Sequence, residues 1–203
     1  MITNKVALFI DGENFRHFIE NSLVKKGYKK TDYSILDIDI NELFRLPLDN
    51  FNIIKKIYFS GKIQIVKGTE KNSKILASKQ RFLKTKLEKQ GYEFIIAGHV
   101  RPQTIIKNKK EEIIFKEKGV DVRIAVELIK AAVDKSYNTV ILCSSDSDLQ
   151  PAIKEARNRG LKIVYLGYES MPNKGLTYTT NKTILIRASE VVKTLVKIKQ
   201  PSP

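Results

Sequence analysis

The segment TVILCSSDSD, residues 139–148, decides how the rest of the chain is arranged. Its first five residues are β-branched or apolar, which is typical of a strand buried on both faces. Two serines and two aspartates follow at once, and residues 149–151 then open a predicted helix. In an open α/β sheet, ligands bind just beyond the carboxyl ends of the strands. We therefore expect Asp146 and Asp148 to lie where such folds carry out their chemistry.

The composition is that of an ordinary globular domain. The chain has 203 residues, of which 42% are hydrophobic and 29% are charged, enough for one domain with a sizeable core. No run approaches the roughly 18 to 20 apolar residues of a membrane span, and the apolar run 6–10 is too short for a secretory signal. Cys143 is the single cysteine and has no intramolecular partner. We expect a cytoplasmic protein with no membrane partner.

Charge is the strongest compositional signal. Lysine and arginine number 37 against 22 aspartates and glutamates, a formal net charge of +15. A surface this basic favours a polyanionic partner, most often a nucleic acid. The alternative is a lysine-rich composition with no bearing on partners, such as an AT-biased genome would produce.

Strand-like and helix-like segments alternate along the chain. The predicted strands are 5–10, 55–60, 92–97, 139–143, 162–166 and 183–186. The first predicted helix begins near residue 15, and further helices are predicted at 38–46, 73–90, 120–134, 151–159 and 189–199. This alternation predicts an α/β fold, a three-layer α/β/α sandwich with a mostly parallel central sheet.

Two regions depart from the alternation. Residues 103–118 read as a β-hairpin with a basic tip, inserted beside the sheet. Residues 167–180 are rich in Gly, Pro, Asn and Thr and are expected to form a mobile loop. We expect residues 1–199 to form one domain and residues 200–203 to be a disordered tail.

Two more aspartates are predicted at the same edge of the sheet as Asp146 and Asp148. Asp11 closes the first strand, and Asp121 opens the helix that precedes residues 139–143, on its sheet-facing side. Carboxylates a few Å apart repel one another unless they share a proton or a cation. Mg²⁺ accepts one or two carboxylates and keeps several waters, and such an ion activates water for attack at phosphorus. All four are candidate metal ligands and catalytic residues, with Asp11 and Asp146 as the expected direct ligands.

Each aspartate taken singly also has a structural explanation. Asp11 could be a turn residue, Asp121 a helix cap, and Asp148 the N-cap of the helix that follows it. Their joint placement from three elements favours the metal site. Ser144 and Ser145 lack an obvious base and are expected to hydrogen-bond metal-bound water or phosphate.

Two glutamates near these aspartates are weaker candidates. Glu127 lies in line with Arg123 and Lys130 on its helix, a spacing typical of surface ion pairs. Glu13 is expected to turn away from the aspartates.

Three sequence blocks resemble a known family. FIDGEN at 9–14, KGVDV at 118–122 and SSDSDLQP at 144–151 resemble the signatures of the NYN domain, the PIN-like nuclease domain of the LabA-like group. The likeness runs from about residue 5 to 195. It implies a metal-dependent ribonuclease with a PIN-type sheet and an acidic pocket that holds Mg²⁺ or Mn²⁺.

The resemblance also assigns residues by position. The acidic pocket would comprise Asp11, Asp121, Asp146 and Asp148, with Asn14 supporting Asp11. The family usually has glycine at Ser145 and phenylalanine at Leu149, both tolerable changes. Glu127 replaces a further family aspartate, which puts the role of that position in doubt.

Two function classes remain open from the sequence. The first is an RNA-cleaving hydrolase, which the resemblance implies to be an endoribonuclease, with DNA left open as a substrate. The second is a non-catalytic nucleic-acid-binding or regulatory module that retains the metal pocket. A haloacid-dehalogenase-like phosphatase is disfavoured, because its nucleophilic Asp needs a second Asp two residues later, and Asp11 is followed by Glu13. Exposed strand edges and the hairpin leave room for a homodimer.

Overall fold

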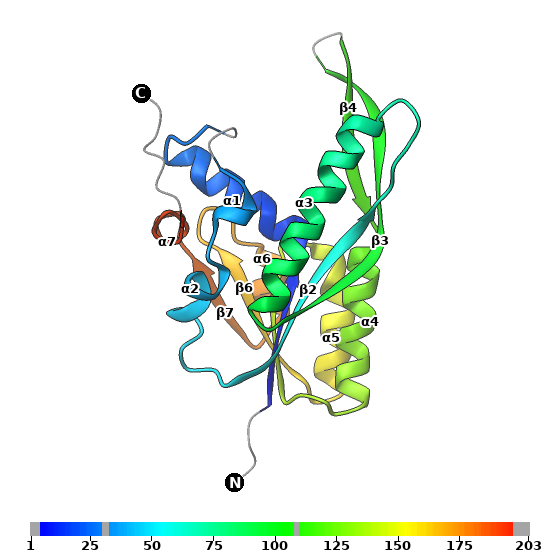
Figure 1. Cartoon of the computed structure of the whole chain (residues 1–203). Helices are drawn as coiled ribbons and strands as arrows, with labels where there is room; N and C mark the ends of the chain where they lie inside the picture. Colours follow the sequence, from blue (N-terminus) through cyan, green and yellow to red (C-terminus); the bar gives the residue numbers. More distant parts are fainter. Residues whose placement is uncertain (1–4, 30–32, 108–109, 197–203) are drawn as a thin grey trace.

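A seven-stranded sheet forms the centre of the computed structural model, which describes residues 5–29, 33–107 and 110–196 (Figure 1). The strand order is β4-β3-β2-β1-β5-β6-β7, and every neighbouring pair is parallel except β3 with β4. The strands are β1 (Val6–Asp11), β2 (Ile53–Ile63), β3 (Tyr92–Lys107), β4 (Lys110–Lys118), β5 (Thr139–Cys143), β6 (Lys162–Tyr168) and β7 (Lys182–Ile186).

Helices cover both faces of this sheet. The α-helices are α1 (Gly12–Lys25), α2 (Ile40–Arg45), α3 (Glu70–Lys89), α4 (Val120–Val133), α5 (Gln150–Asn158), α6 (Lys174–Thr179) and α7 (Ala188–Lys193). Two short 3₁₀ helices, η1 (Ile35–Asp37) and η2 (Ser147–Leu149), complete the described elements. In Figure 1, α4 and α5 lie side by side on one face of the sheet.

The core is divided in two by the sheet. Alternate residues of β1 point to opposite faces, so Leu8 joins the cluster under α1, α2, α3 and α7, while Phe9 joins the cluster under α4, α5 and α6. Every residue of β1 and β5 is buried, as predicted for strands covered on both sides. The three-layer α/β/α sandwich with a mostly parallel sheet is therefore confirmed.

The register of the two central strands positions the functional edge. β1 and β5 are parallel neighbours, with Ile10 opposite Cys143. Asp11 and Ser144 are the next residues along each strand, so both chains leave the sheet at the same point. On the other side of β1, Asp11 pairs with Phe59 of β2. The end of β1 is thus enclosed between two strands.

The hairpin differs from the expected insertion. β3 runs without a break from Tyr92 to Lys107, and β4 pairs antiparallel with it from His99 to Lys107. The predicted strand 92–97 and the first hairpin strand are therefore one long strand, whose far half extends beyond β2 (Figure 1). Of the predicted basic tip, residues 108 and 109 lie outside the described residues.

Other predicted boundaries also change. The expected loop 167–180 contains α6 and the last residues of β6, so it is not wholly irregular. The final helix covers Ala188–Lys193 rather than 189–199, and residues 197–203, including the predicted tail, lie outside the described part of the chain. β4 and β7 form the two sheet edges, and the homodimer stays a prediction. No helix among the described residues is long and apolar enough to cross a membrane.

Candidate metal centre and active site

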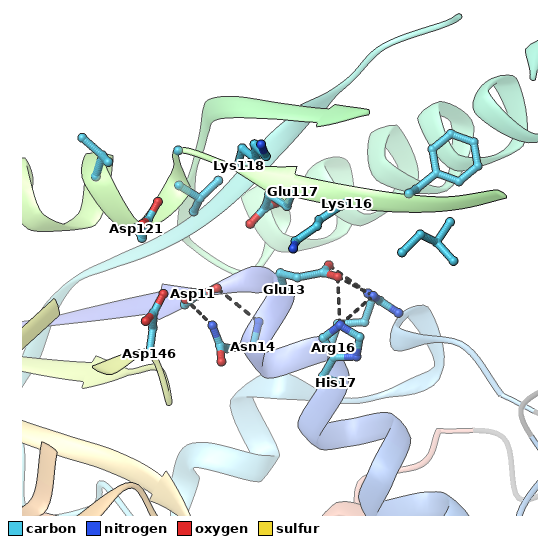
Figure 2. A pocket seen from close by; sticks show the side chains of 15 residues that line it. Asp11, Glu13, Asn14, Arg16, His17, Lys116, Glu117, Lys118, Asp121 and Asp146 are labelled. Carbon is cyan, nitrogen blue, oxygen red and sulfur yellow. Dashed lines mark hydrogen bonds and ion pairs between the residues drawn. The ribbon is translucent and has the colours of Figure 1, made fainter. Parts of the chain in front are cut away.

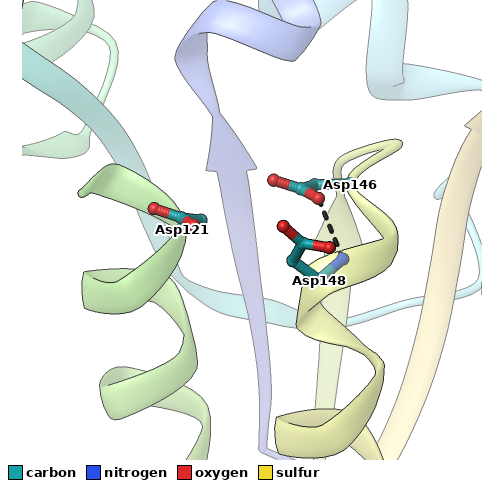
Figure 3. Close-up of side chains that lie close together, drawn as sticks. All are labelled: Asp121, Asp146 and Asp148. Carbon is teal, nitrogen blue, oxygen red and sulfur yellow. Dashed lines mark hydrogen bonds between the residues drawn. The ribbon is translucent and has the colours of Figure 1, made fainter. Parts of the chain in front are cut away.

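Three carboxylates converge at the carboxyl edge of the sheet. Asp121 comes from the first turn of α4, Asp146 directly precedes η2, and Asp148 lies within η2. Each offers an oxygen atom, and these three oxygens all lie within 4.8 Å of one another (Figure 3). Asp121 and Asp146 are partly buried, whereas Asp148 is exposed. Two separate segments of the chain therefore bring negative charge to one point.

Local backbone geometry explains how Asp121 reaches this point. Gly119 links the end of β4 to the start of α4 and has a φ of +87°, a conformation that glycine adopts readily. The helix therefore starts at Val120, whose side chain is buried, and Asp121 stands in its first turn. Gly119 is the N-cap and offers no side chain, so Asp121 is not the capping residue of α4.

The three carboxylates fit a hard divalent cation. In the part of the chain that the structure describes, none of the three forms an ion pair with a lysine, arginine or histidine. Clustered carboxylates without a neighbouring cation repel one another. Carboxylate oxygens are the ligands that Mg²⁺ or Mn²⁺ prefers, with waters completing the coordination. A metal ion would offset the repulsion that the protein itself leaves in place.

Asp11 lies beside this group in a different environment. Asp11, Asp121 and Asp146 line one cavity of about 800 Å³ (Figure 2). The Asp11 side chain is buried and accepts three hydrogen bonds: from the Asn14 backbone N–H at 3.1 Å, from the Asn14 side-chain amide at 2.6 Å, and from the Ser144 hydroxyl at 2.9 Å. Burial raises the pKa of Asp11 above its usual value, although these hydrogen bonds oppose the rise.

The serines after β5 bind protein groups in this structure. Ser144, which is wholly buried, donates its hydroxyl to Asp11 and accepts a hydrogen bond from the Asp146 backbone N–H at 3.1 Å. Ser145 donates to the Asn14 side-chain oxygen at 2.5 Å. We expected both hydroxyls to serve metal-bound water or phosphate. In the described residues they tie the end of β1 to the end of β5 and so fix the position of Asp146. The expected contact with metal-bound water or phosphate stays a prediction.

Capping at η2 also differs from the expectation. The Asp146 carboxylate accepts a hydrogen bond from the Asp148 backbone N–H at 2.9 Å and is the N-cap of η2. The alternative in which Asp148 caps the following helix is wrong, because α5 begins after Leu149 and has no side-chain cap. Asp146 is therefore held in place by its own cap bond, while Asp148 is the exposed member of the three.

Glu127 stays outside the cavity. It lies two turns along α4 from Asp121 and forms an ion pair with Arg123 at 2.7 Å. It does not belong to the carboxylate group or to the residues that line the cavity. The surface ion-pair interpretation is the one that the geometry supports.

The rim of the cavity holds charged residues that sequence reasoning missed. Arg16 and His17 line it from α1, and Lys116 and Lys118 line it from β4. Figure 2 shows these side chains around the same opening as Asp11, Asp121 and Asp146. The alternation Lys116-Glu117-Lys118 on a predicted hairpin strand was the available signal. Nothing in the sequence indicated that this strand crosses the mouth of the acidic cavity.

Glu13 organises the α1 side of the rim. Its carboxylate accepts a hydrogen bond from Arg16 at 2.6 Å and lies 3.0 Å from the His17 ring nitrogen, so it faces away from the three aspartates as expected (Figure 2). Arg16 also pairs with Glu20. Burial alone would raise the pKa of Glu13, but the contacts with His17 and Arg16 lower it to about 2. Glu13 is therefore a charged partner of Arg16 and His17 rather than a proton donor.

A further missed residue, Asn173, holds the other side of the site. Asn173 donates its side-chain amide to the Ser145 carbonyl at 2.9 Å and caps α6 by accepting from the Leu176 backbone N–H. The signal was the asparagine itself, a preferred N-cap residue, three residues before Leu176. Through Asn173, the segment expected to be a loop is fixed to the end of β5.

The fold and the acidic edge define a class of protein. A mostly parallel α/β/α sandwich with clustered carboxylates beyond its central strands is the arrangement of a PIN-like, metal-binding domain. The model of the NYN domain matches residues 5–187, and the chain belongs to that family. NYN domains are generally metal-dependent nucleases, so nucleic acid is the substrate class that membership implies.

A solved structure agrees with this fold. A Vibrio parahaemolyticus RIMD 2210633 protein of unknown function superposes with a TM-score of 0.55 at 18% sequence identity, over 90% of this chain and 93% of that chain. At this identity the likeness concerns the fold alone. A search of curated proteins gave no match.

Proposed function

We propose that this protein is a ribonuclease that hydrolyses RNA phosphodiester bonds with Mg²⁺ or Mn²⁺. The observation that carries the proposal is the convergence of Asp121, Asp146 and Asp148 within 4.8 Å, with no cation of the described residues paired to them. The basic rim and the formal net charge of +15 support a polyanionic substrate. RNA rather than DNA rests on the family resemblance.

Each residue has a distinct task in this proposal. Asp121, Asp146 and Asp148 would hold the metal ion, which when bound supplies an activated water and charge stabilisation at phosphorus. Asp11 would act beside them, as a ligand or by fixing Ser144 and through it the Asp146 backbone. The buried, hydrogen-bonded state of Asp11 favours the positioning task.

The rim would bind the phosphate backbone. Lys116 and Lys118 lie on one side of the cavity, and Arg16 lies on the other. The guanidinium of Arg16 is held by Glu13 and Glu20, which fix its direction and whose negative charges offset its positive field. The two lysines carry no ion pair among the described residues, so they are the stronger candidates for direct phosphate contacts.

The proposal is tested by Asp146→Asn. Asparagine is as good an N-cap as aspartate, so η2 keeps its cap and the melting temperature should change little. Loss of the charged ligand should abolish Mn²⁺-dependent cleavage of a labelled RNA, by about 100-fold or more. Asp134→Asn is the matched control, because Asp134 is exposed at the other end of α4, far along the helix from Asp121.

The non-catalytic alternative gives a different result. A binding module would show no cleavage with Mg²⁺ or Mn²⁺ in the unmodified protein, but strongly salt-dependent RNA binding. Cleavage by Asp146→Asn at the unmodified rate would remove the assignment of the site. Cleavage that persists in a metal chelator would remove the metal from the mechanism.

A further inference from the structure

A second cavity lies directly beside the acidic one. It has a volume of about 370 Å³ and shares part of its wall with the first cavity: Glu13, Arg16, Phe115 and Glu117 line both. A nucleic-acid strand bound at the metal centre would therefore lie next to this second cavity, separated from it only by the shared wall. Its size is in the range of small ligand sites, roughly 300–1,000 Å³.

The walls of the second cavity are largely apolar and partly aromatic. Tyr58 lines the cavity but is almost wholly buried and stacked on Phe94, and its hydroxyl is already committed to the Gly12 carbonyl at 3.2 Å. Phe115 faces the cavity from β4, and Leu76 and Leu83 face it from α3. Such walls suit a flat, apolar face.

Polar groups converge on the same cavity. The Gln80 amide nitrogen donates to the Ser60 hydroxyl at 2.8 Å and to the Gly61 carbonyl at 2.7 Å, which fixes the direction of the side chain. Its carbonyl oxygen accepts no hydrogen bond from the described residues. Glu117 likewise uses one carboxyl oxygen to accept from the Gly61 N–H at 2.6 Å and leaves the other unused within the described part. Two orientated polar atoms are thus available to a ligand.

Glu117 is built closely into this wall. A Cβ added at Gly61 would lie 2.8 Å from the Glu117 carboxyl oxygen, so only glycine allows the approach. Burial raises the pKa of Glu117 to about 7, and the nearby charges of Glu13 and Asp11 add to the rise. Near neutral pH the carboxyl group is therefore available in its protonated form, which both donates and accepts a hydrogen bond.

We infer that the second cavity receives one unstacked nucleobase of the RNA whose phosphate lies at the carboxylate centre. The inference rests on the proposed function for the placement of that phosphate. A base offers an apolar face to the aromatic wall and a hydrogen-bonding edge to Gln80 and Glu117, and proteins recognise single-stranded RNA by this combination. Arg16 and Lys79 also line the cavity and supply positive charge for the phosphate backbone.

The test compares base-bearing and abasic RNA on a protein that does not cleave. The Asp146→Asn protein is titrated into a fluorescein-labelled single-stranded RNA of about 12 nucleotides and into an abasic oligomer of equal length and charge. Fluorescence anisotropy gives both dissociation constants. The base-bearing RNA should bind about tenfold or more tightly, as expected when base stacking on an aromatic wall is lost.

Filling the cavity identifies where the preference arises. Leu76→Trp fills it from α3, and Ile75→Trp is the matched control, because Ile75 is exposed on the same helix and does not line the cavity. Leu76→Trp should reduce the preference for base-bearing RNA to about twofold or less, while Ile75→Trp should leave it intact. Ile63→Phe, which fills the cavity from β2, repeats the test should Leu76→Trp fail to fold.

The outcomes separate this inference from the proposed function. An unchanged preference in the filled variants, or no preference at all, overturns the nucleobase cavity even if the unmodified protein cleaves RNA. A preference for base-bearing RNA that the filled variants abolish supports the nucleobase cavity. It does so even if the unmodified protein cleaves no RNA with Mg²⁺ or Mn²⁺, because absence of cleavage would overturn only the proposed hydrolase. Absence of RNA binding overturns both.

Discussion

Replacing Asp11 by alanine should destabilise the protein far more than the loss of an ordinary helix cap. The variant removes the N-cap of α1, worth about 1 kcal/mol, and leaves two side-chain donors without their acceptor. The Ser144 hydroxyl is wholly buried, so losing its acceptor costs about 1–3 kcal/mol. The Asn14 amide is only half-buried and can reach water. We expect a total loss of about 2–4 kcal/mol in the free energy of unfolding.

The raised pKa of Asp11 places the loss toward the lower half of that range. Burial of the carboxylate already costs free energy, and alanine removes that cost together with the hydrogen bonds. Asp11→Asn keeps one acceptor oxygen and the cap, so it should cost only about 1 kcal/mol. Urea unfolding measures the stability of both variants. We expect a lower urea concentration at the midpoint and an unchanged dependence of the unfolding free energy on urea.

Asp39→Ala is the control for the Asp11 experiment. Asp39 caps α2 through a single exposed bond from the Glu42 backbone N–H at 3.1 Å, and its side chain makes no other hydrogen bond among the described residues. Its loss should cost about 1 kcal/mol. If Asp11→Ala costs no more than Asp39→Ala, the network that joins β1 to β5 does not stabilise this edge of the sheet, and the reasoning fails.

Three further predictions concern the rim and the start of α1. Lys116→Gln and Lys118→Gln should each reduce the slope of log affinity against log salt for single-stranded RNA by about 0.7, while Lys25→Gln, at the far end of α1, should not. Glu13 has a lowered pKa of about 2, so its ion pair with Arg16 stabilises the protein above pH 4.5, and this stability is lost as the pH falls toward 2. Glu13→Gln should remove it. At this partly exposed pair, urea unfolding should show a difference of about 1–2 kcal/mol at neutral pH and none in acid. Gly12→Ala should cost about 2–3 kcal/mol, because its Cβ would lie 2.5 Å from the Phe59 carbonyl and the Tyr58 ring, and an unchanged unfolding midpoint would contradict the packing.

The sequence predicted the parts of the fold that depend on local pattern. β1 and β5 are continuous apolar runs, and their burial on both faces follows directly from that composition. Asp11 ends β1 and Ser144 follows β5. Both could be assigned to the carboxyl edge of the sheet, because parallel strands run in the same direction. The acidic edge was therefore predictable before any distance was known.

The continuity of β3 was not predictable, because two residues that usually break strands lie within it. Gly98 has a φ of +64° and lies close to the end of β4, near an irregularity in the β2–β3 pairing. Pro102 lies beyond Val100, the last β3 residue paired with β2, so its missing N–H costs no bond to that strand. Tertiary position, not local pattern, allows the strand to continue.

The division of labour within the site also required the structure. Asp146 and Asp148 are equivalent in the sequence motif, but only Asp146 caps η2. The role of Ser144 depends on a contact with Asp11, 133 residues away. The second cavity depends on Glu117 reaching Gly61 across 56 residues. Such contacts follow from register and packing, which no local spacing encodes.

The most direct test of the central claim is an anomalous difference map from a crystal soaked in Mn²⁺. Coordination at about 2.1 Å is expected for oxygen ligands of a small divalent cation. The account predicts a peak bound by Asp121 and Asp146, with Asp148 bound directly or through water, and loss of that peak in Asp146→Asn. A map with no peak between these carboxylates, or with the metal bound elsewhere on the protein, would contradict it.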